Sequence, residues 1–298
     1  PIIIVPAMDG DMWNHPAVID HTRLLRNRGL TVLDPEDGVL ASGLIGKGRL
    51  PGEESILEAI TVTLGSQHDM SGQRILISAG PTREPIDAVR FITNGSSGKM
   101  GYAIAERAVQ RGAEVVLVSG PTALMPPAKA DYIPVVTADE MYRALAQRFS
   151  WSTVLIMSAA VGDFRPRQPA LGKVKKRHWK EEVLELDRTL DILATLSRDR
   201  THQILVGFAA ETNDLIENGR RKLQEKNLDL VAINNIAGPH SAFGNESNKV
   251  IFISSKGEIT HLERMPKRAL ADRLLDEIKT LLAPCAQSGK QSRVLRGL

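Results

Sequence analysis

The loop at residues 79–101 has the composition of an anion-binding turn. It begins Ala79-Gly-Pro-Thr-Arg-Glu-Pro85 and ends Asn94-Gly-Ser-Ser-Gly-Lys-Met-Gly101. Its glycines and hydroxyls lead into a predicted helix. The first N–H groups of that helix, with Ser96, Ser97 and Lys99, could hold a phosphate. An ordinary glycine-rich turn is the alternative, but a loop of this length usually has a function.

Two later segments add groups that suit phosphates. In Ser158-Ala-Ala-Val-Gly-Asp-Phe-Arg165, small residues let a planar ligand approach the backbone, and Asp163 could hold a magnesium ion that carries phosphates. Spacing alone favours a simple turn cap for Asp163. The basic run 173–180, which contains Lys173, is a phosphate contact, a solvated face or a short nucleic-acid patch with one aromatic residue, Trp179.

A pair of lysines lies on the helix predicted for residues 214–226. Lys222 and Lys226 are four residues apart, so they share one face and could grip a triphosphate. The alternative is a solvent-facing helix in which Glu225 compensates the charge. No single segment decides the matter, but together they indicate a site for a phosphorylated ligand.

Two common nucleotide motifs are absent. The chain lacks the Gly-x-Gly-x-x-Gly fingerprint of dinucleotide-binding folds, and the strand that ends at Ser119 has no acidic residue for a ribose hydroxyl. The phosphate-loop motif of nucleoside triphosphatases also fails, because Met100 follows Gly98-Lys99. These absences argue against an ordinary NAD enzyme and a P-loop enzyme.

The elements that must position these residues are apolar strands alternating with amphipathic helices. This pattern predicts a doubly wound α/β fold with a mostly parallel, Rossmann-like sheet, whose strands end at one ligand-binding edge. The predicted strands are 75–78, 114–119, 153–157, 204–207 and 228–233, and the predicted helices are 100–111, 138–149 and 214–226.

The two ends of the chain differ from this pattern of apolar strands and amphipathic helices. Residues 1–69 contain short strands at 2–5 and 30–33, helices at 16–28 and 53–64, and a glycine-rich stretch, 38–49, that we expect to be irregular. The polar run 65–72 is expected to be a linker. At the other end, a hairpin at 249–263 and a helix from Pro266 precede a flexible tail, 285–298.

Composition narrows the class of protein. The 298 residues are 42% hydrophobic, with a net charge of +3 and 4% aromatic residues, which suits a folded domain and disfavours nucleic-acid binding. The single Cys285 excludes an internal disulfide and a four-cysteine zinc site. No apolar run is long enough for a membrane span, so we expect a cytoplasmic protein. Since Pro1 directly precedes a strand, we also expect the later part of a longer protein.

Residues 74–281 resemble the phosphopantothenate–cysteine ligase domain of the bifunctional coenzyme A biosynthesis family. The resemblance rests on the motifs Ala79–Pro85, Asn94–Gly101, Ala159-Ala-Val-Gly-Asp163, Lys173-Val-Lys-Lys176 and Gly207-Phe-Ala-Ala-Glu-Thr212, with Leu228-Asp-Leu230 and Asn234-Asn235. It implies a homodimer that joins phosphopantothenate to cysteine through an acyl-cytidylate made from CTP with Mg²⁺. The site would lie near the subunit interface, and the hairpin 249–263 would serve dimerisation.

The resemblance also implies roles for single residues. Asn94 orients the intermediate, with Arg90 nearby, and the segment 173–180 resembles a flap. This chain has Thr189-Leu-Asp-Ile192 where the family often has Asn-Pro-Asp-Ile. The implied CTP contacts are Ala159, Asp163 (also the metal contact), Lys173, Asp191, Ile192, Phe208, Lys222 and Lys226, and the implied contacts to the substrate phosphate or intermediate are Gly95, Ser96, Ser97, Gly98 and Lys99.

Residues 1–69 resemble the C-terminal end of the family's FMN-dependent decarboxylase domain. The matching stretches are Pro6-Ala-Met-Asp9 and Ala41–Arg49. The resemblance places the family's catalytic histidine and most of the flavin pocket upstream of this chain, so this segment alone is not expected to decarboxylate. Asp9 stands where the family usually has Asn, and Ser42 where it has the proton-donating Cys. A serine hydroxyl is a much poorer acid than a thiol, which argues against complete decarboxylation even with the upstream part.

The predicted division is therefore 1–69 decarboxylase remnant, 70–284 ligase domain and 285–298 tail. A flavin half would permit a larger oligomer, and the alternative function is a non-catalytic nucleotide-binding or scaffold module.

Overall fold

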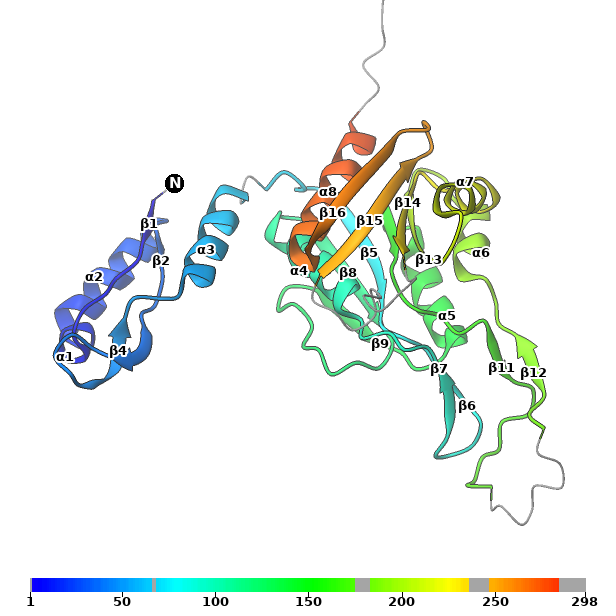
Figure 1. Cartoon of the computed structure of the whole chain (residues 1–298), viewed down its shortest axis with the longest axis horizontal. Coiled ribbons are helices and arrows are strands. Elements are labelled where there is room, and N and C mark those ends of the chain that lie inside the picture. The colour runs from blue at the N-terminus through cyan, green and yellow to red at the C-terminus, as the bar shows by residue number, and fades with distance from the viewer. Residues whose placement is uncertain (1, 66–67, 175–182, 236–246, 284–298) are drawn as a thin grey trace, which may run out of the picture. The chain divides into compact units, whose positions relative to one another are not determined.

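The computed structural model of this chain describes residues 2–65, 68–174, 183–235 and 247–283. Two compact units divide the chain: residues 1–71 with 110–112 form the smaller, and the remainder form the larger (Figure 1). Most of the basic run 173–180 and the predicted tail lie outside the described residues. Within the described ranges, no helix is both long and apolar enough to cross a membrane.

An eight-stranded sheet forms the centre of the larger unit. Its first six strands in chain order are parallel, and the last two form an antiparallel hairpin at one edge. Across the sheet the strands follow the order β16-β15-β14-β13-β10-β5-β8-β9. Their bounds are β5 (Arg74–Ala79), β8 (Glu114–Ser119), β9 (Asp131–Pro134), β10 (Val154–Met157), β13 (Ile204–Glu211), β14 (Leu230–Asn235), β15 (Ser247–Ser254) and β16 (Ile259–Pro266).

The order of the parallel strands fixes where a ligand can bind. We number the six parallel strands of this sheet by their order along the chain, from β5 to β14. From β9 to β14 across the sheet they then come third, second, first, fourth, fifth and sixth, so the direction of winding reverses between β5 and β10. At such a switch point the connections leave toward opposite faces and open a crevice at the carboxyl ends. The expected mostly parallel, doubly wound sheet is confirmed.

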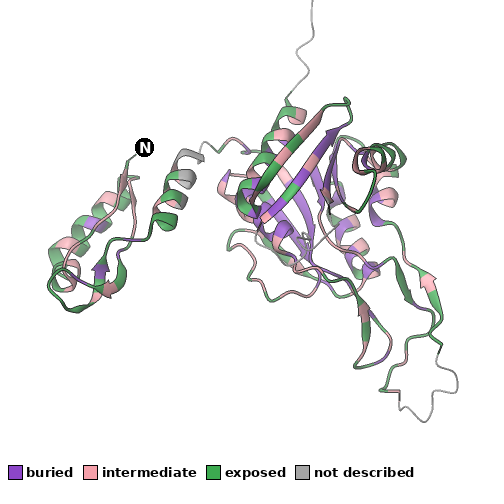
Figure 2. Cartoon of the chain, viewed as in Figure 1, coloured by how far each residue is buried: buried purple, intermediate pink, exposed green. Residues whose placement is uncertain are grey.

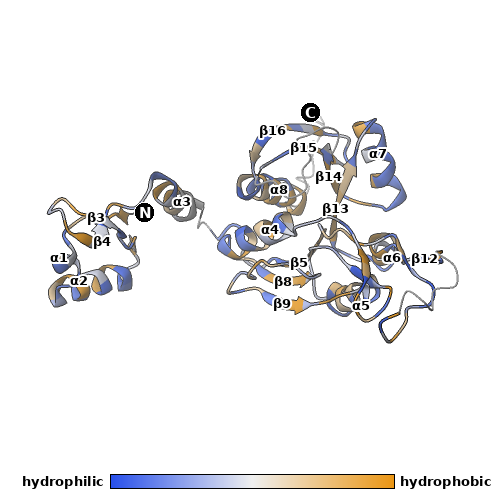
Figure 3. Cartoon of the chain, turned by 60° about the horizontal axis from the view of Figure 1, so that its bottom comes forward, coloured by the Kyte–Doolittle hydropathy of each residue, from blue (hydrophilic) through white to orange (hydrophobic). Residues whose placement is uncertain are grey.

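Helices cover both faces of this sheet. α4 (Lys99–Gln110) and α8 (Lys267–Leu282) lie on one face, and α5 (Ala138–Phe149), α6 (Ile192–Arg198) and α7 (Leu215–Glu225) lie on the other (Figure 1). The central strands are buried along their length (Figure 2). The helices that cover them contain both hydrophilic and hydrophobic residues (Figure 3). A parallel sheet buried on both sides requires the continuous apolar runs that the sequence contains.

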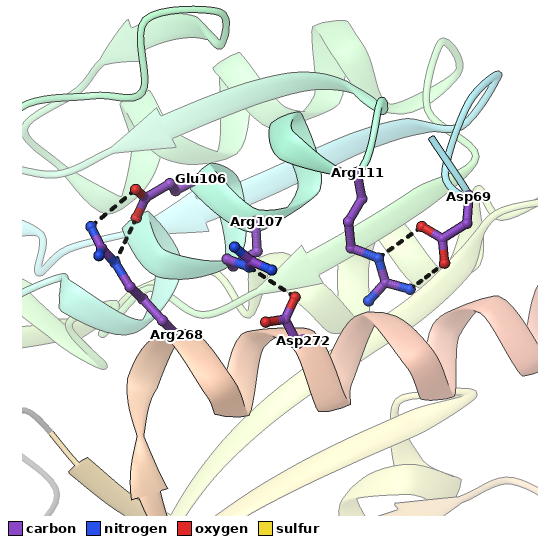
Figure 4. Close-up of polar contacts among 6 residues, drawn as sticks. All are labelled: Asp69, Glu106, Arg107, Arg111, Arg268 and Asp272. Carbon is purple, nitrogen blue, oxygen red and sulfur yellow. Dashed lines mark hydrogen bonds and ion pairs between the residues drawn. The ribbon is translucent and has the colours of Figure 1, made fainter. Parts of the chain in front are cut away.

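Ion pairs join the two helices on the first face. Arg107 Nε lies 2.8 Å from Asp272 Oδ1, and Arg268 pairs with Glu106 at 3.1 Å (Figure 4). The Arg107 side chain is only 7% exposed, so this ion pair is shielded from solvent. Loss of either residue would leave the other charge buried without a partner.

The polar run 65–72, expected as a linker, is anchored at its described end. Met70 is fully buried, and Asp69 Oδ2 lies 2.7 Å from Arg111 Nη2 (Figure 4). Both residues of this ion pair belong to the smaller unit.

In the larger unit, two short antiparallel strand pairs lie outside the central sheet and were not predicted. The loop after β5 contains β6 (Arg83–Pro85) paired with β7 (Phe91–Thr93), and β11 (Phe164–Pro166) pairs with β12 (Leu186–Arg188). Each strand has three residues, too few for a visible alternation of apolar and polar positions.

The smaller unit corrects one expectation. Its glycine-rich stretch is an antiparallel hairpin, because Gly43 takes a positive φ of 84° in the turn and Gly48 lets the Met8 backbone approach, where a Cβ atom would lie 2.1 Å from the Met8 carbonyl oxygen. The elements of this unit are β1 (Ile3–Ile4), α1 (Gly10–Trp13), α2 (Pro16–Asn27), β2 (Thr31–Val32), β3 (Glu36–Val39), β4 (Ile45–Arg49) and α3 (Glu53–Gly65).

Gly101 sets how closely α4 packs against β5. A Cβ atom there would lie 2.6 Å from the Ala79 Cβ and 3.1 Å from its Cα. We expect Gly101→Ala to lower the free energy of unfolding by about 1–3 kcal/mol, since helix and strand must separate. Urea unfolding measures this. Gly172→Ala is the control, because no atom lies within 4 Å of its added Cβ; equal stability of the two variants would contradict the prediction.

Candidate functional site

The loops that follow β5 and β10 are tied together at the switch point. Asn94 Nδ2 donates to the carbonyl oxygens of Ala160 at 3.3 Å and Val161 at 3.0 Å. Thr82 Oγ1 accepts from the Gly162 N–H at 2.9 Å. These bonds join residues 66 to 80 positions apart and turn two loops into one wall of a cavity.

A cavity of about 800 Å³ lies beside this wall, a volume suited to a drug-sized or nucleotide-sized ligand. Side chains from β13, α6 and α7 complete its lining. The predicted site residues that line it are Asn94, Gly95, Ala159, Asp163, Asp191, Ile192, Phe208, Lys222 and Lys226.

Lys226 is held by the residue that caps α6. Asp191 Oδ1 accepts from the Ala194 N–H at 3.0 Å, and Asp191 Oδ2 lies 2.8 Å from Lys226 Nζ. Burial of the Asp191 carboxyl opposes its charged form, but the hydrogen bonds from Lys226 and Ala194 outweigh burial and leave its pKa lowered. The carboxylate therefore stays ionised and fixes both the helix start and the lysine.

Lys222 is paired in the same way. Its Nζ lies 2.6 Å from Glu211 Oε1, at the end of β13, and Asn218 Nδ2 donates to Glu211 Oε2 at 3.3 Å. The Lys222 side chain is 33% exposed. Two ammonium groups one helical turn apart thus face one cavity, each beside a carboxylate that offsets its charge.

The predicted phosphate turn lines a smaller cavity of about 140 Å³ next to the first. The two cavities share Ala159, Phe208 and three further residues. Four polar residues that were not predicted as site residues complete its polar lining. The Oδ1 atoms of two of them, Asn234 and Asn248, are buried without a hydrogen-bond partner in the described structure. The predicted lining residues are Ser96, Ser97, Gly98 and Lys99, and the unpredicted polar ones are Ser158, Asn234, Asn248 and the buried Lys267.

Two residues predicted for the ligase site lie outside the linings of both cavities. The Arg90 guanidinium is engaged with the Asp87 carboxylate and the Val174 carbonyl oxygen, and Lys173 is exposed. In the smaller unit, the half-buried Asp9 precedes α1, and Ser42 is exposed in the turn between β3 and β4. Within a single chain, the structure therefore gathers most of the predicted site but not all of it.

Comparison with known proteins now gives the family. Residues 70–282 match the model of the DNA/pantothenate metabolism flavoprotein C-terminal domain, and residues 1–65 match a flavoprotein model. The coenzyme A biosynthesis bifunctional protein CoaBC of Bacillus subtilis is 41% identical over 295 residues, which cover 98% of this chain and 72% of that protein. The chain belongs to the CoaBC family.

Other CoaBC-like proteins extend the comparison. The crystal structure of the C-terminal domain of a coenzyme A biosynthesis bifunctional protein CoaBC superposes with a TM-score of 0.63 at 43% identity, covering 72% of this chain and 98% of that one. A cysteine/cysteine sulfinic acid decarboxylase from an unknown prokaryotic organism is 40% identical over 95% of this chain and 80% of its own length. Relatives at about 40% identity therefore include both a protein named for coenzyme A biosynthesis and one named as a cysteine or cysteine sulfinic acid decarboxylase.

The sequence contained a signal for only some of the residues that we missed. Glu211 stands inside Gly207–Thr212 and Asn234 inside the Asn234-Asn235 pair, both used for the resemblance to the CoaBC ligase domain. Asn248 and Lys267 lie on β15 and at the start of α8, far from any motif. The pairing of β14 with β15 brings Asn248 to the site, and the pairing of Ser247 with Pro266 places Lys267 next to it.

We expect Lys222→Met to weaken binding of inorganic tripolyphosphate about tenfold, or about 1.4 kcal/mol. The substitution removes a partly buried cation and leaves Glu211 uncompensated beside the cavity. Isothermal titration calorimetry measures the dissociation constant. Arg221→Met is the matched control, since Arg221 lies on the same helix, is 61% exposed and belongs to neither cavity lining. Equal losses in both variants would mean that helix charge alone is being measured.

Proposed function

We propose that the larger unit is a ligase that uses CTP to join 4′-phosphopantothenate to L-cysteine. The observation that carries the proposal is the convergence of Asn94, Asp163, Lys222 and Lys226 on one cavity of about 800 Å³ at the switch point of the sheet. The CoaBC relatives are named as bifunctional proteins of coenzyme A biosynthesis, which agrees with this substrate class.

The proposed reaction has two steps. A carboxylate oxygen of phosphopantothenate attacks the α-phosphorus of CTP, and pyrophosphate leaves, which gives an acyl-cytidylate. The cysteine amine then attacks the acyl carbon, CMP departs with the bridging oxygen, and the nitrogen loses a proton. Both steps shift negative charge toward phosphate oxygens, so cations that are already in place lower the barrier.

The residues that line the two cavities would bind or orient different parts of the substrates. Lys222 and Lys226 lie where the triphosphate would bind, and Phe208 and Ile192 supply apolar surface for the base and ribose. Asn94, tied to two carbonyl oxygens of the facing loop, would orient the mixed anhydride. The turn 95–99 and the adjoining small cavity would receive the phosphate of phosphopantothenate, and Lys173 would reach the triphosphate from outside the cavity.

The donor groups fit a magnesium ion carried by the nucleotide. The described residues contain no group of three or more His, Cys, Asp or Glu side chains that could hold a metal. Magnesium bound to a triphosphate needs only one or two protein carboxylates, with phosphates and water as the other ligands. Asp163 lines the cavity and would hold it. When bound, the ion neutralises phosphate charge.

The smaller unit and the assembly are part of the same proposal. Residues 1–69 would be the end of a decarboxylase half that binds FMN mainly through upstream residues, with Asp9 and Ser42 at its altered positions. Two copies of the ligase unit would associate through the hairpin β15–β16. The family's flavoprotein match at residues 1–65 supports the first part of this division.

Incubation of the chain with phosphopantothenate, cysteine, magnesium and one nucleoside triphosphate at a time tests the proposal. We expect phosphopantothenoylcysteine, pyrophosphate and CMP in equal amounts with CTP, and slower turnover with ATP, GTP or UTP. Mass spectrometry and a pyrophosphate assay measure the products. Omission of cysteine should leave the acyl-cytidylate. CTP binding without any pyrophosphate release would instead support a non-catalytic module.

Substitutions should separate the two steps. Lys173→Gln removes a cation needed for attack on the α-phosphorus, so we expect no acyl-cytidylate. Asn94→Asp puts a carboxylate where an amide held two carbonyl oxygens, so the intermediate should form and accumulate because its acyl carbon is misplaced. Mass spectrometry of quenched reactions measures this difference. Normal turnover by both variants would refute the site assignment.

A further inference from the structure

A fully buried carboxylate lies in the turn between β6 and β7, outside the proposed site. The side chain of Asp87 is 0% exposed. Its Oδ1 accepts the N–H groups of Val89 and Arg90, each at 2.8 Å, and its Oδ2 accepts from Arg90 Nε at 3.0 Å and from Arg90 Nη2. A buried charge is tolerated only with this degree of pairing.

One further bond of Asp87 leaves the turn. The N–H of Val174 donates to Asp87 Oδ2 at 3.2 Å, and Arg90 Nη2 donates to the carbonyl oxygen of Val174 at 3.0 Å. The Asp87–Arg90 pair therefore holds both backbone polar groups of Val174. The Arg90 side chain and the backbone N–H groups keep the pKa of Asp87 below its usual range, so the carboxylate remains an acceptor at any physiological pH.

The residue before Val174 is Lys173, to which the proposed function gives a role in the first step. A long, exposed lysine side chain can place its ammonium group accurately only if its backbone is fixed. A second bond, from the Ala170 N–H to the Ile86 carbonyl oxygen at 3.0 Å, ties the same stretch to the same turn. Residues 170–174 thus follow the β6–β7 turn, although more than 80 positions separate them.

We propose that Asp87 is a positioning residue for Lys173, acting through the hydrogen bonds that it and Arg90 make to Val174. The inference rests on the proposed function of Lys173. The same role accounts for the position of Arg90, which the ligase resemblance places near the active site but which lies outside both cavity linings. Its guanidinium donates to the carbonyl oxygen of Val174 and so helps to hold that residue.

A purely local role is the rival explanation. The Oδ1 bonds to Val89 and Arg90 stabilise the turn by themselves, and a turn could need Asp87 for no other reason. Asp87→Asn separates the two explanations. The amide oxygen can keep the turn bonds, whereas the NH₂ group that replaces Oδ2 cannot accept from Arg90 or Val174.

The experiment compares the intact chain with Asp87→Asn in two independent measurements. Hydrogen exchange at the Val174 amide needs no ligand, and we expect it to be about tenfold faster in the variant because the N–H loses its acceptor. In the ligase assay we expect kcat to fall about 10- to 100-fold through misplacement of Lys173, with the KM for CTP within about threefold of wild type.

Controls isolate the contact. Asp131→Asn makes the same change in an exposed aspartate paired with Arg148 at 3.1 Å, and it should alter neither measurement. Arg90→Lys keeps Asp87 charged but replaces the bidentate guanidinium with a single ammonium group. It should change both the exchange rate and kcat in the same direction as Asp87→Asn, but by a smaller factor. If Asp87→Asn does not fold, Arg90→Lys decides.

The outcomes are distinct. Faster Val174 exchange together with a lower kcat supports the inference. Unchanged exchange, or faster exchange with normal kcat in an active enzyme, overturns it while the proposed function stands. A wild-type chain without ligase activity overturns the proposed function and this role of Asp87 together.

Discussion

The loop after β5 is the constraint on which the rest of the site depends. Three of its side chains are buried, and each accepts a backbone N–H from a different later segment. Thr82 accepts from Gly162, Glu84 from Ala138 at 2.8 Å at the start of α5, and Asp87 from Val174. Each bond satisfies a backbone donor far along the chain, and an unsatisfied buried carboxylate would be costly. The loop therefore sets the paths of the segments after β9, after β10 and around Lys173.

The charges of the two lysines that line the larger cavity follow from a second requirement. Lys222 on α7 and Lys226, which caps its C-terminal end, are one turn apart, and two partly buried ammonium groups at that spacing would repel. Glu211 and Asp191 come from different elements and offset one charge each, so the lysines can be held near the cavity in the absence of an anion. A triphosphate would then meet cations whose side chains are already ordered, which reduces the entropy lost on binding. The carboxylates would moderate its affinity, and a cation bound to the phosphates would lessen that effect.

Sequence reasoning succeeded where local pattern and global fold agree. The parallel strands are continuous apolar runs. The helix predicted at 138–149 matches α5, which the structure shows to begin at a capping box formed by Thr137 and Glu140. Sequence reasoning failed where a segment depends on distant partners. Glu84 and Asp87 tie the three-residue strands of β6–β7 to Ala138 and Val174. The capping residue of the seven-residue helix α6, Asp191, is itself paired with the distant Lys226. The stretch 38–49 was misjudged because its glycines permit a tight hairpin as readily as an irregular loop.

The same distinction explains which site residues could be found from sequence. Asn94, Asp163, Lys222 and Lys226 have the chemistry of the expected ligand, so residue type and motif identify them. Asp87, Glu84 and Thr82 act on backbone groups, and nothing in their type reveals the partner. Yet all three lie between Gly80 and Asn94, inside the loop that the resemblance uses. A motif of this kind combines residues that face a ligand with residues that hold other segments in place. Its length then follows from the number of segments to be held, as well as from the size of the ligand.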